Sequence, residues 1–477
     1  MNLFAIEQMT TSKVIVTHLV SAIFLVVGYF YFSSEYTYAV KFQEIFYVYI
    51  NILLLYHIKK YTGTFSHILV VFLFMLFFFG GIRIVSDLFS FGVEDLRESM
   101  FINYMISKKA NVRALLNENL SIVCLGIGQF IYYKKKGRTN SIIVPVRYSP
   151  LPNYITFFLL IIGLAIKGYT SFKLLFNLIT YGYHAMFSGE GGESIPVYLR
   201  ALALLPIFVA LSNVGKSKKW IWVFVIYLVL DLATGQRGMA ALSAVTFAYV
   251  LIRQGIIHIN AIKAGVASLL AVFVFIFMGN FRNDQATTAE NLVLNEFFWE
   301  QGVSINVLQC AVMEQEKLDY HFKDMFGNVY STFAFLDKNY NRGGGSTLDQ
   351  TLHYKVWSKY ISYNMNSDRY YAGLGMGGNY IGQCYAVGKE WMVIIVSLMI
   401  PFFLMYLDRK VLYGSLVWSF FFFNILLTFL YIPRDCLFTF LTSCIEPLLV
   451  TIILLFLTFL FGRRKKNERV SSGMYCK

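Results

Sequence analysis

Three arginines stand at separate polar breaks in a chain that is otherwise strongly apolar. Arg237 lies in the stretch TGQRG, Arg282 in MGNFRND and Arg434 in YIPRDCL. Because the guanidinium group is a planar fork of donors, it binds phosphate or carboxylate oxygens at two points. Gly235 and Gly238 flank the first arginine, and their lack of a side chain lets a ligand approach the backbone. The residue types therefore indicate anion binding at these positions.

Each arginine also has a local explanation that involves no ligand. Arg237 is long enough to extend to lipid headgroups, or it simply begins a helix. Arg282 lies two residues before Asp284 and Arg434 directly precedes Asp435, so an ion pair accounts for either one. Capping of a helix end is a further explanation for Arg434. From the sequence, the local and the ligand-binding interpretations both stay open.

Membrane helices are the elements that must position these arginines. Hydrophobic residues make up 57% of the chain and charged residues only 14%, which excludes an ordinary soluble domain. The apolar runs approach the roughly 20 residues that a helix needs to cross a bilayer, and no alternating barrel strands occur. We therefore predict an all-α fold, a polytopic membrane bundle of about twelve transmembrane helices. The expected spans are 14–33, 40–58, 66–87, 118–133, 153–171, 196–213, 219–235, 238–254, 262–280, 390–408, 412–432 and 436–461.

The basic residues of the short loops test this topology. With the N-terminus inside, KKKGR, KSKK, RRKK and the shorter basic pairs all fall on the cytoplasmic side, as the positive-inside rule expects. The net charge of +14 then reflects inner loops that face anionic lipid headgroups, so it indicates no nucleic-acid partner. The second and fourth spans are the weakest, because Lys41, Gln43 and Glu44 begin one and Gln129 interrupts the other.

The polar material is concentrated in one very large outer loop. Within it, NLVLNEFFWEQGVSINVLQCAVMEQ and LDQTLHYKVWSKYI are typical of amphipathic helices, and RGGGST and GLGMGGNYIG are typical of turns. We therefore expect a compact helical cap outside the membrane. The expected parts are 1–279 with helices one to nine and outer segments at 88–117 and 172–195, a periplasmic loop domain at 280–389, helices ten to twelve at 390–462, and a basic cytoplasmic tail at 463–477.

The predicted spans hold few charged side chains near their centres. Glu44, Asp87, Asp231 and Glu446 each fall within a few residues of a span end, which argues against a proton relay through the bundle. Arg83 precedes Asp87 by four residues on the same helical face, so we expect a structural ion pair between them.

Cysteine spacing and short motifs give no sign of a metal or a nucleotide. The six cysteines form no CxxC pair, and only Cys310 and Cys384 share the outer loop, where they are either disulfide-bonded or free buried thiols. Gly373, Gly375 and Gly378 form an isolated GxGxxG outside any βαβ unit, and P-loop and HExxH motifs do not occur. The sequence therefore predicts no metal site and no cofactor.

Arginines at the outer membrane boundary fit a lipid-linked diphosphate, whose tail stays in the bilayer while its headgroup lies at the interface. In this light the chain resembles the Wzy-type O-antigen and capsule repeat-unit polymerases. The shared features are many spans, a basic cytoplasmic side, one large outer loop, the TGQRG hairpin, an arginine at the start of that loop, and GLGMGGNYIGQCYAVGKEW before the next span. Gln383 stands where an acidic residue is common in the family. The resemblance is strongest over residues 195–435.

The resemblance implies a membrane glycosyltransferase. Such an enzyme moves the growing glycan from undecaprenyl diphosphate onto the non-reducing end of an incoming lipid-linked repeat unit, with neither metal nor nucleotide sugar. It also implies a multi-pass protein of the bacterial inner membrane, with both termini cytoplasmic and the large loop periplasmic. The expected partners are the undecaprenyl-diphosphate-linked oligosaccharide, the lipid bilayer and a Wzz-type chain-length regulator.

Within this interpretation the three arginines are candidate catalytic residues, because positive charge stabilises the leaving diphosphate. His353 is the first candidate for the base that activates the attacking hydroxyl, with Asp349 and Asp368 as alternatives and His184 and His321 as weaker ones. The substrate-binding residues that we expect are Gly235, Gly238, Asp349, Asp368, Arg369, Asn379 and Tyr380.

Two other functions share much of this pattern. A ligase that transfers finished polymer to lipid A core would have the same topology and arginines, and would differ only in its acceptor. A flippase for lipid-linked oligosaccharide is the non-enzymatic alternative. We expect a flippase to have short loops on both sides of the membrane, so the large outer loop favours an enzyme.

Overall fold

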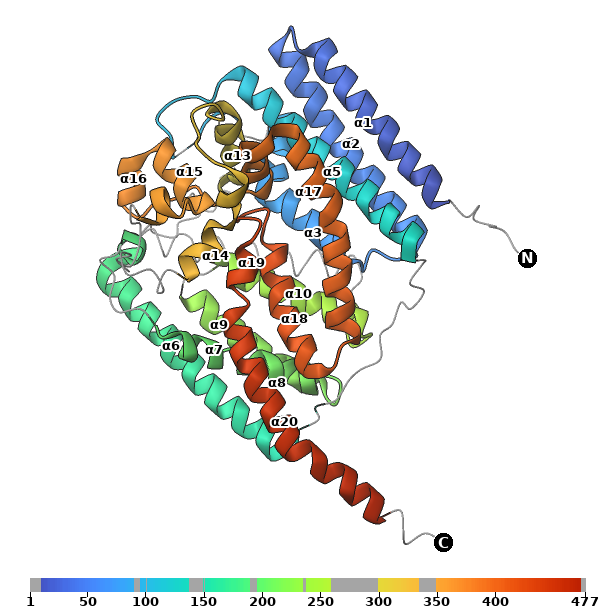
Figure 1. Cartoon of the computed structure of the whole chain (residues 1–477), viewed down its shortest axis with the longest axis vertical. Coiled ribbons are helices and arrows are strands. Elements are labelled where there is room, and N and C mark those ends of the chain that lie inside the picture. Colours follow the sequence, from blue (N-terminus) through green and yellow to red (C-terminus); the bar gives the residue numbers. More distant parts are fainter. Residues whose placement is uncertain are drawn as a thin grey trace, which may run out of the picture. The chain divides into compact units, whose positions relative to one another are not determined.

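The computed structural model describes residues 10–89, 95–99, 101–136, 149, 151–188, 195–234, 237–258, 299–333 and 349–472. Every regular element in these ranges is a helix, which confirms the predicted all-α fold (Figure 1). The chain divides into two compact units. The first unit comprises Met1–Ile142, Leu292–Tyr406 and Phe429–Thr439, and the second comprises Ile143–Asn291, Leu407–Thr428 and Phe440–Lys477.

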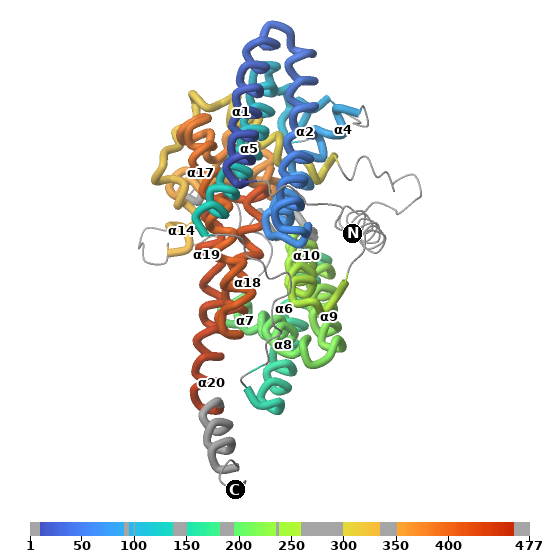
Figure 2. The backbone as a smooth tube through the Cα atoms, turned by 90° about the vertical axis from the view of Figure 1, so that its right-hand side faces the viewer, coloured from blue at the N-terminus to red at the C-terminus, as the bar shows by residue number. Residues whose placement is uncertain are grey.

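Three long helices, α1 (Thr11–Phe32), α2 (Tyr36–Thr62) and α5 (Lys108–Lys136), lie side by side in the first unit (Figures 1 and 2). Glycines allow their close approach. The ring of His18 on α1 lies where a β-carbon at Gly126 of α5 would stand. α5 is the most buried of the long apolar helices, since neighbouring helices cover nearly all of it. Its polar residues therefore face protein and not lipid.

A fourth apolar segment of the first unit contains a widened turn. It consists of α3 (Ile68–Leu76), the π-helical turn η1 (Phe77–Gly81) and α4 (Ile82–Leu88). A π-turn inside an apolar helix is uncommon and often accompanies a functional site.

Arg83, at the start of α4, does not pair with Asp87 as the sequence suggested. Its guanidinium donates to the carbonyl of Trp299 and to the side chain of Asn306, both in the outer loop. Asp87 instead lies 3.6 Å from the Lys41 ammonium. Arg83 thus anchors the outer loop to a membrane helix, and these oxygen acceptors stabilise the buried cation.

Every regular element in the described part of the outer loop is a helix. Its elements are α13 (Ser304–Met313), η4 (Phe322–Phe326), α14 (Gly327–Thr332), η6 (Asp349–His353), α15 (Trp357–Met365), α16 (Ser367–Tyr371) and the first turns of α17 (Tyr380–Tyr413). Cys310 and Cys384 are both buried free thiols, so the alternative without a disulfide is the correct one.

Helix α17 breaks where the outer loop ends. Gly388 and Lys389 have non-helical backbone angles, and Lys389 adopts a φ of 51°. The break separates a short arm, which begins at Tyr380, from the part that continues at Glu390. It coincides with the boundary that the sequence predicts between the loop domain and the tenth span.

The second unit holds α6 (Asn153–Ser188), α7 (Val197–Leu202), α8 (Leu205–Asn213), η2 (Lys218–Trp220), α9 (Ile221–Ala233), α10 (Arg237–Arg253), most of α18 (Leu416–Leu430) and α20 (Ile445–Ser472). α6 packs against α7, α8 and α9, and α20 packs against α7. Two ion pairs are buried here, one between Lys167 and Asp231 and one between Arg253 and Asp408. The remaining short helix, α19, is Thr439–Thr442.

Seven described helices are long and apolar enough to cross a membrane. They coincide with seven of the expected spans, and the two weakest, the second and the fourth, are among them. The expected sixth, eighth and eleventh spans correspond to the shorter apolar helices Val197–Asn213, Gly238–Arg253 and Leu416–Leu430. The expected ninth span, 262–280, lies outside the described residues. The total of twelve stays a prediction.

Candidate functional site

Arg434 lies in a turn that packs against the glycine-rich stretch before α17. Its carbonyl accepts a hydrogen bond from the Gly378 amide over 3.0 Å. Gly377 has a φ of 77°, and a β-carbon there would lie only 3.4 Å from the Arg434 carbonyl oxygen. Glycine suits this position because it adopts a left-handed backbone without steric cost. The stretch and the turn therefore meet backbone to backbone, with the guanidinium beside them.

The Arg434 guanidinium donates to the Ser304 hydroxyl over 3.5 Å. The ion pair with Asp435 that the sequence suggested is not formed within 4.0 Å, and one Asp435 oxygen instead accepts from the Cys436 amide over 2.7 Å. Among the described residues no carboxylate lies within 4.0 Å of this guanidinium. A guanidinium has five N–H donors, so Arg434 has hydrogen-bonding capacity left for an anion.

Asn379 and Tyr380 hold this region in place from inside the protein. Asn379 is buried and caps the start of α17, where its side-chain oxygen accepts from the Ile381 amide over 2.7 Å. Its amide group donates to the Ser304 carbonyl over 3.1 Å. The Tyr380 hydroxyl is buried 2.6 Å from the Ser121 hydroxyl of α5. Both residues thus position Ser304 and the glycine-rich stretch around Arg434.

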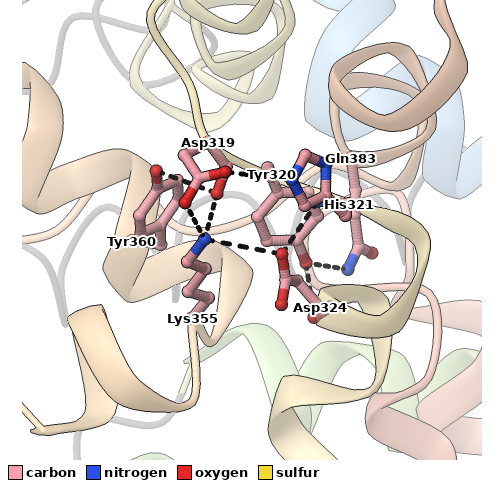
Figure 3. Close-up of polar contacts among 7 residues, drawn as sticks. All are labelled: Asp319, Tyr320, His321, Asp324, Lys355, Tyr360 and Gln383. Atoms are coloured by element: carbon pink, nitrogen blue, oxygen red, sulfur yellow. Dashed lines mark hydrogen bonds and ion pairs between the residues drawn. The ribbon is translucent and has the colours of Figure 1, made fainter.

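A second polar cluster lies where the outer loop folds back on itself (Figure 3). The Lys355 ammonium lies 2.7 Å from a carboxylate oxygen of Asp319 and 3.6 Å from one of Asp324. It also donates to the Asp319 carbonyl. The hydrogen bond from Lys355 lowers the pKa of Asp319. The Lys355 side chain therefore holds the two ends of the turn 319–324 together.

Local backbone features explain how Lys355 reaches this turn. Lys355 itself has a left-handed φ of 46°, which is rare for a residue with a side chain. Gly327, at the start of α14, lies directly against the Tyr354 and Lys355 carbonyls, where no β-carbon would fit. The two segments of the loop, 319–327 and 354–355, are thus held together by backbone contact as well as by the ion pairs of Lys355.

A hydrogen-bond chain connects this cluster to the turn that carries Arg434, and Figure 3 shows its first part, from Tyr320 to Gln383. The side-chain amide of Gln383 donates to the Tyr320 hydroxyl over 2.8 Å. The backbone amide of Leu437 donates to the side-chain oxygen of Gln383 over 2.8 Å. Tyr320 lies between Asp319 and His321 in sequence, and Leu437 follows Arg434 by three residues. The two polar centres therefore belong to one connected network within the first unit.

Two outer-loop histidines differ in their surroundings. The Nε2 atom of His321 lies 3.0 Å from a carboxylate oxygen of Asp319, and both side chains are largely exposed. His353 is exposed at the end of η6, with its ring edge-on to Tyr354 at a centroid distance of 4.7 Å. A carboxylate beside an imidazole orients the ring and supports its action as a base. On geometry His321 is the better-supported base, although the sequence ranked His353 first.

The other expected site residues are dispersed. Asp368 is exposed and Arg369 half-buried on α16. Asp349 begins η6. Arg237 is the first residue of α10 and Gly238 follows it, both in the second unit. Gly235 and Arg282 lie outside the described residues. The structure therefore brings Arg434 together with Asn379 and Tyr380, and places Arg237 in the other unit.

Several residues of this region escaped sequence analysis. Ser304, Asp319, Tyr320, Asp324 and Lys355 belong to no motif, and their proximity depends on contacts between distant segments. Gly327 offered a weak signal, because a glycine between two short helices often marks a close backbone approach. In the described ranges no three His, Cys, Asp or Glu side chains are grouped to hold a metal ion.

Comparison with known proteins gives one match. A family model described as O-antigen polysaccharide polymerase Wzy matches residues 14–466. No curated protein and no solved structure matches the chain.

Proposed function

The chain belongs to the O-antigen polysaccharide polymerase family, and we propose that it joins undecaprenyl-diphosphate-linked repeat units at the outer face of the bacterial inner membrane. Membership makes it a multi-pass membrane enzyme that polymerises lipid-linked repeat units. In the proposed reaction the growing glycan leaves its lipid diphosphate and joins the non-reducing end of an incoming lipid-linked unit.

The bonding changes define what the protein must supply. The bond between the anomeric carbon and the diphosphate oxygen breaks, and a bond from that carbon to an acceptor hydroxyl oxygen forms. The hydroxyl proton passes to a base, and the lipid diphosphate departs as an anion. Donors aimed at the departing oxygen lower the barrier, because they bind it more strongly as charge develops.

Arg434 is the residue that carries this proposal. Its guanidinium is half-buried, has no carboxylate within 4.0 Å among the described residues, and lies beside the half-exposed backbone of Gly377. A cation with unused donors beside a bare backbone suits a diphosphate. We assign Arg237 and Arg282 the same role at their own turns, with Gly235 and Gly238 allowing the ligand to approach Arg237.

The base is proposed to come from the outer loop. His321 is favoured because Asp319 orients its ring at 3.0 Å, and His353, Asp349 and Asp368 remain candidates. Arg369 and the exposed outer aromatic residues are proposed to contact sugars. A metal-independent reaction, a periplasmic outer loop, cytoplasmic termini and a Wzz-type regulator complete the proposal.

The experiment supplies purified protein with lipid-linked repeat units alone, in the presence of a chelator and without nucleotides. A ladder of longer lipid-linked glycans supports the proposal. Growth that begins only when lipid A core is added would identify a ligase instead. Dependence of the ladder on added metal would contradict the metal-independent reaction.

Arginine variants then test the assigned roles. Arg237→Lys and Arg434→Lys keep the charge but lose the two-point fork, so we expect at least a tenfold loss of product at unchanged protein level. Arg97→Lys is the matched control, because Arg97 is an outer arginine that already pairs with Asp95 at 2.7 Å. Full ladders from both test variants would refute the diphosphate role.

A further inference from the structure

Glu118 is a buried acid inside the helical bundle that has no hydrogen-bond or ion-pair partner among the described residues. It lies on α5 with 1% of its surface exposed, and neither carboxyl oxygen hydrogen-bonds to any described residue. The other acids in the described membrane helices each lie beside a cation. These pairs are Glu44 and Asp87 with Lys41, Asp231 with Lys167, Glu390 with Arg113, Asp408 with Arg253, and Glu446 with Arg200.

The position of Glu118 along α5 places it inside the hydrocarbon layer. The helix ends in the lysine cluster that starts at Lys134, which marks its end at the membrane surface. Glu118 lies about 24 Å from Lys134 at a rise of 1.5 Å per residue, within a core of roughly 30 Å. An ionisable residue at such a depth is rare and usually functional.

Oxygen atoms and bare backbone surround this carboxyl. Tyr47 of α2 is 1% exposed, its hydroxyl makes no hydrogen bond of regular geometry to a described residue, and it interacts with the Asn51 side chain and electrostatically with Glu118. On the facing segment, a β-carbon at Gly80 would lie 3.5 Å from the Glu118 Oε1, and the Tyr47 hydroxyl lies against Gly81. These glycines belong to the π-turn η1. Tyr47 of α2 and the glycine backbone of η1 thus lie around the Glu118 carboxyl of α5.

Tyr380 of α17 is the remaining titratable group that interacts with Glu118, and its hydroxyl is already bound to Ser121. No lysine, arginine or histidine of the described chain forms an ion pair with Glu118. A bare carboxylate in such surroundings would cost several kcal/mol. The carboxyl therefore needs a bound cation.

We propose that Glu118 and Tyr47 form an intramembrane site for a small monovalent cation, either a proton or Na⁺. A carboxylate and a tyrosine hydroxyl are hard oxygen donors, which such cations prefer. A single carboxylate supplies too little charge for a divalent ion, whose protein sites combine several. This site is separate from the glycan transfer reaction and does not depend on the proposed function.

Carbodiimide labelling tests the site directly, because dicyclohexylcarbodiimide reacts with buried carboxyls only when they are protonated. The full-length protein in lipid nanodiscs is labelled across a pH series, in NaCl or in choline chloride at equal ionic strength. Peptide mass spectrometry then locates the N-acylurea adduct. Labelling of Glu118 that falls as pH rises supports a proton site, and suppression by Na⁺ at fixed pH identifies the ion as Na⁺.

Either of two results would overturn the proposal: no adduct on Glu118 at any pH, or an adduct that responds to neither pH nor Na⁺. Glu390→Gln is the control for reagent access, since Glu390 is paired with Arg113 at 2.7 Å and half-exposed. It should leave the Glu118 adduct unchanged.

Two variants add a second readout. Glu118→Gln keeps the shape of the side chain and should abolish the response of the melting temperature to Na⁺ and remove the part of its pH dependence that comes from Glu118. Tyr47→Phe serves if that variant fails to fold. It removes one oxygen, so the H⁺ or Na⁺ concentration at half-maximal change in Glu118 labelling should shift by about fivefold or more, as expected for one lost hydrogen bond. Tyr56→Phe, an exposed position on the same helix, is its control. An unchanged midpoint in Tyr47→Phe would exclude Tyr47 from the site.

Discussion

The Gln383 amide donates to the Tyr320 hydroxyl over 2.8 Å, and that hydroxyl in turn donates to the Asp324 carbonyl over 2.9 Å. A tyrosine hydroxyl has one proton, so the donor between these two side chains must be the glutamine. The same glutamine accepts from the Leu437 amide. Position 383 thus requires one donor and one acceptor, which an amide provides and a carboxylate does not.

Replacing Gln383 with Glu tests this requirement. The carboxylate would still accept from Leu437 but would face an oxygen of Tyr320 that has no proton to give. We expect the free energy of unfolding to fall by about 1–3 kcal/mol, as for an unsatisfied buried polar group. Thermal unfolding in detergent measures it, with Gln350→Glu as a control elsewhere in the loop. Wild-type stability in Gln383→Glu would show that the hydrogen bond to Tyr320 is unimportant.

Gly377→Ala should displace the turn that carries Arg434. At a φ of 77° an alanine is strained by about 1–2 kcal/mol, and relief of that strain would move the backbone that contacts the Arg434 carbonyl. We expect a shorter glycan ladder and a lower melting temperature. Gly375→Ala is the matched control, because a β-carbon there lies at an ordinary 3.6 Å from Ser362 and the backbone is not left-handed. Equal effects of the two substitutions would contradict the argument.

The ion pair between Lys355 and Asp319 should weaken at low pH. The hydrogen bond from Lys355 lowers the pKa of Asp319, so the folded protein binds a proton there less readily than the unfolded chain. The stabilisation is therefore present above the ordinary Asp pKa of about 3.9 and is lost as pH falls through the lowered value. Hydrogen exchange of the 319–326 amides, corrected for intrinsic rates, should rise over that range. Lys355→Met should remove the pH-dependent part, and persistence of that part would assign it to another group.

Lys389→Gly should stabilise the break in α17. The backbone angles of Lys389, φ 51° and ψ −144°, suit glycine and strain a residue with a β-carbon by about 1–3 kcal/mol. We expect a higher melting temperature. Lys134→Gly, in the last turn of the regular helix α5, should instead give no gain in melting temperature. A lower melting temperature in Lys389→Gly would show that the lysine side chain contributes more than the strain costs.

The sequence predicted most of the helical architecture because apolar length and loop charge are local properties. It placed α1, α2, α3 and the membrane part of α17 within a few residues. It missed the first ten residues of α5, because KKANVRALLN is polar and resembles an exposed loop. After the two exposed lysines, most of that stretch is buried against other parts of the protein. The expectation that spans hold acids only near their ends therefore does not describe Glu118.

The candidate site was less predictable, because it depends on contacts between distant segments. Arg434 was identified from its residue type and its place in a turn, yet its neighbour Ser304 is 130 residues away in sequence. The pairing of Arg83 with Trp299 and Asn306, in place of the nearby Asp87, arises in the same way. Gln383 was noted as a departure from a family pattern, and only the hydrogen bonds to Tyr320 and Leu437 explain it.

The contact between the glycine-rich stretch and the Arg434 turn is made by main-chain atoms on both sides. Such a junction keeps its geometry when the neighbouring side chains are replaced, provided that residues 377 and 378 stay without a β-carbon. Substitutions of the side chains around the turn therefore leave the guanidinium in its place. The position of one arginine depends on the backbone of two glycines.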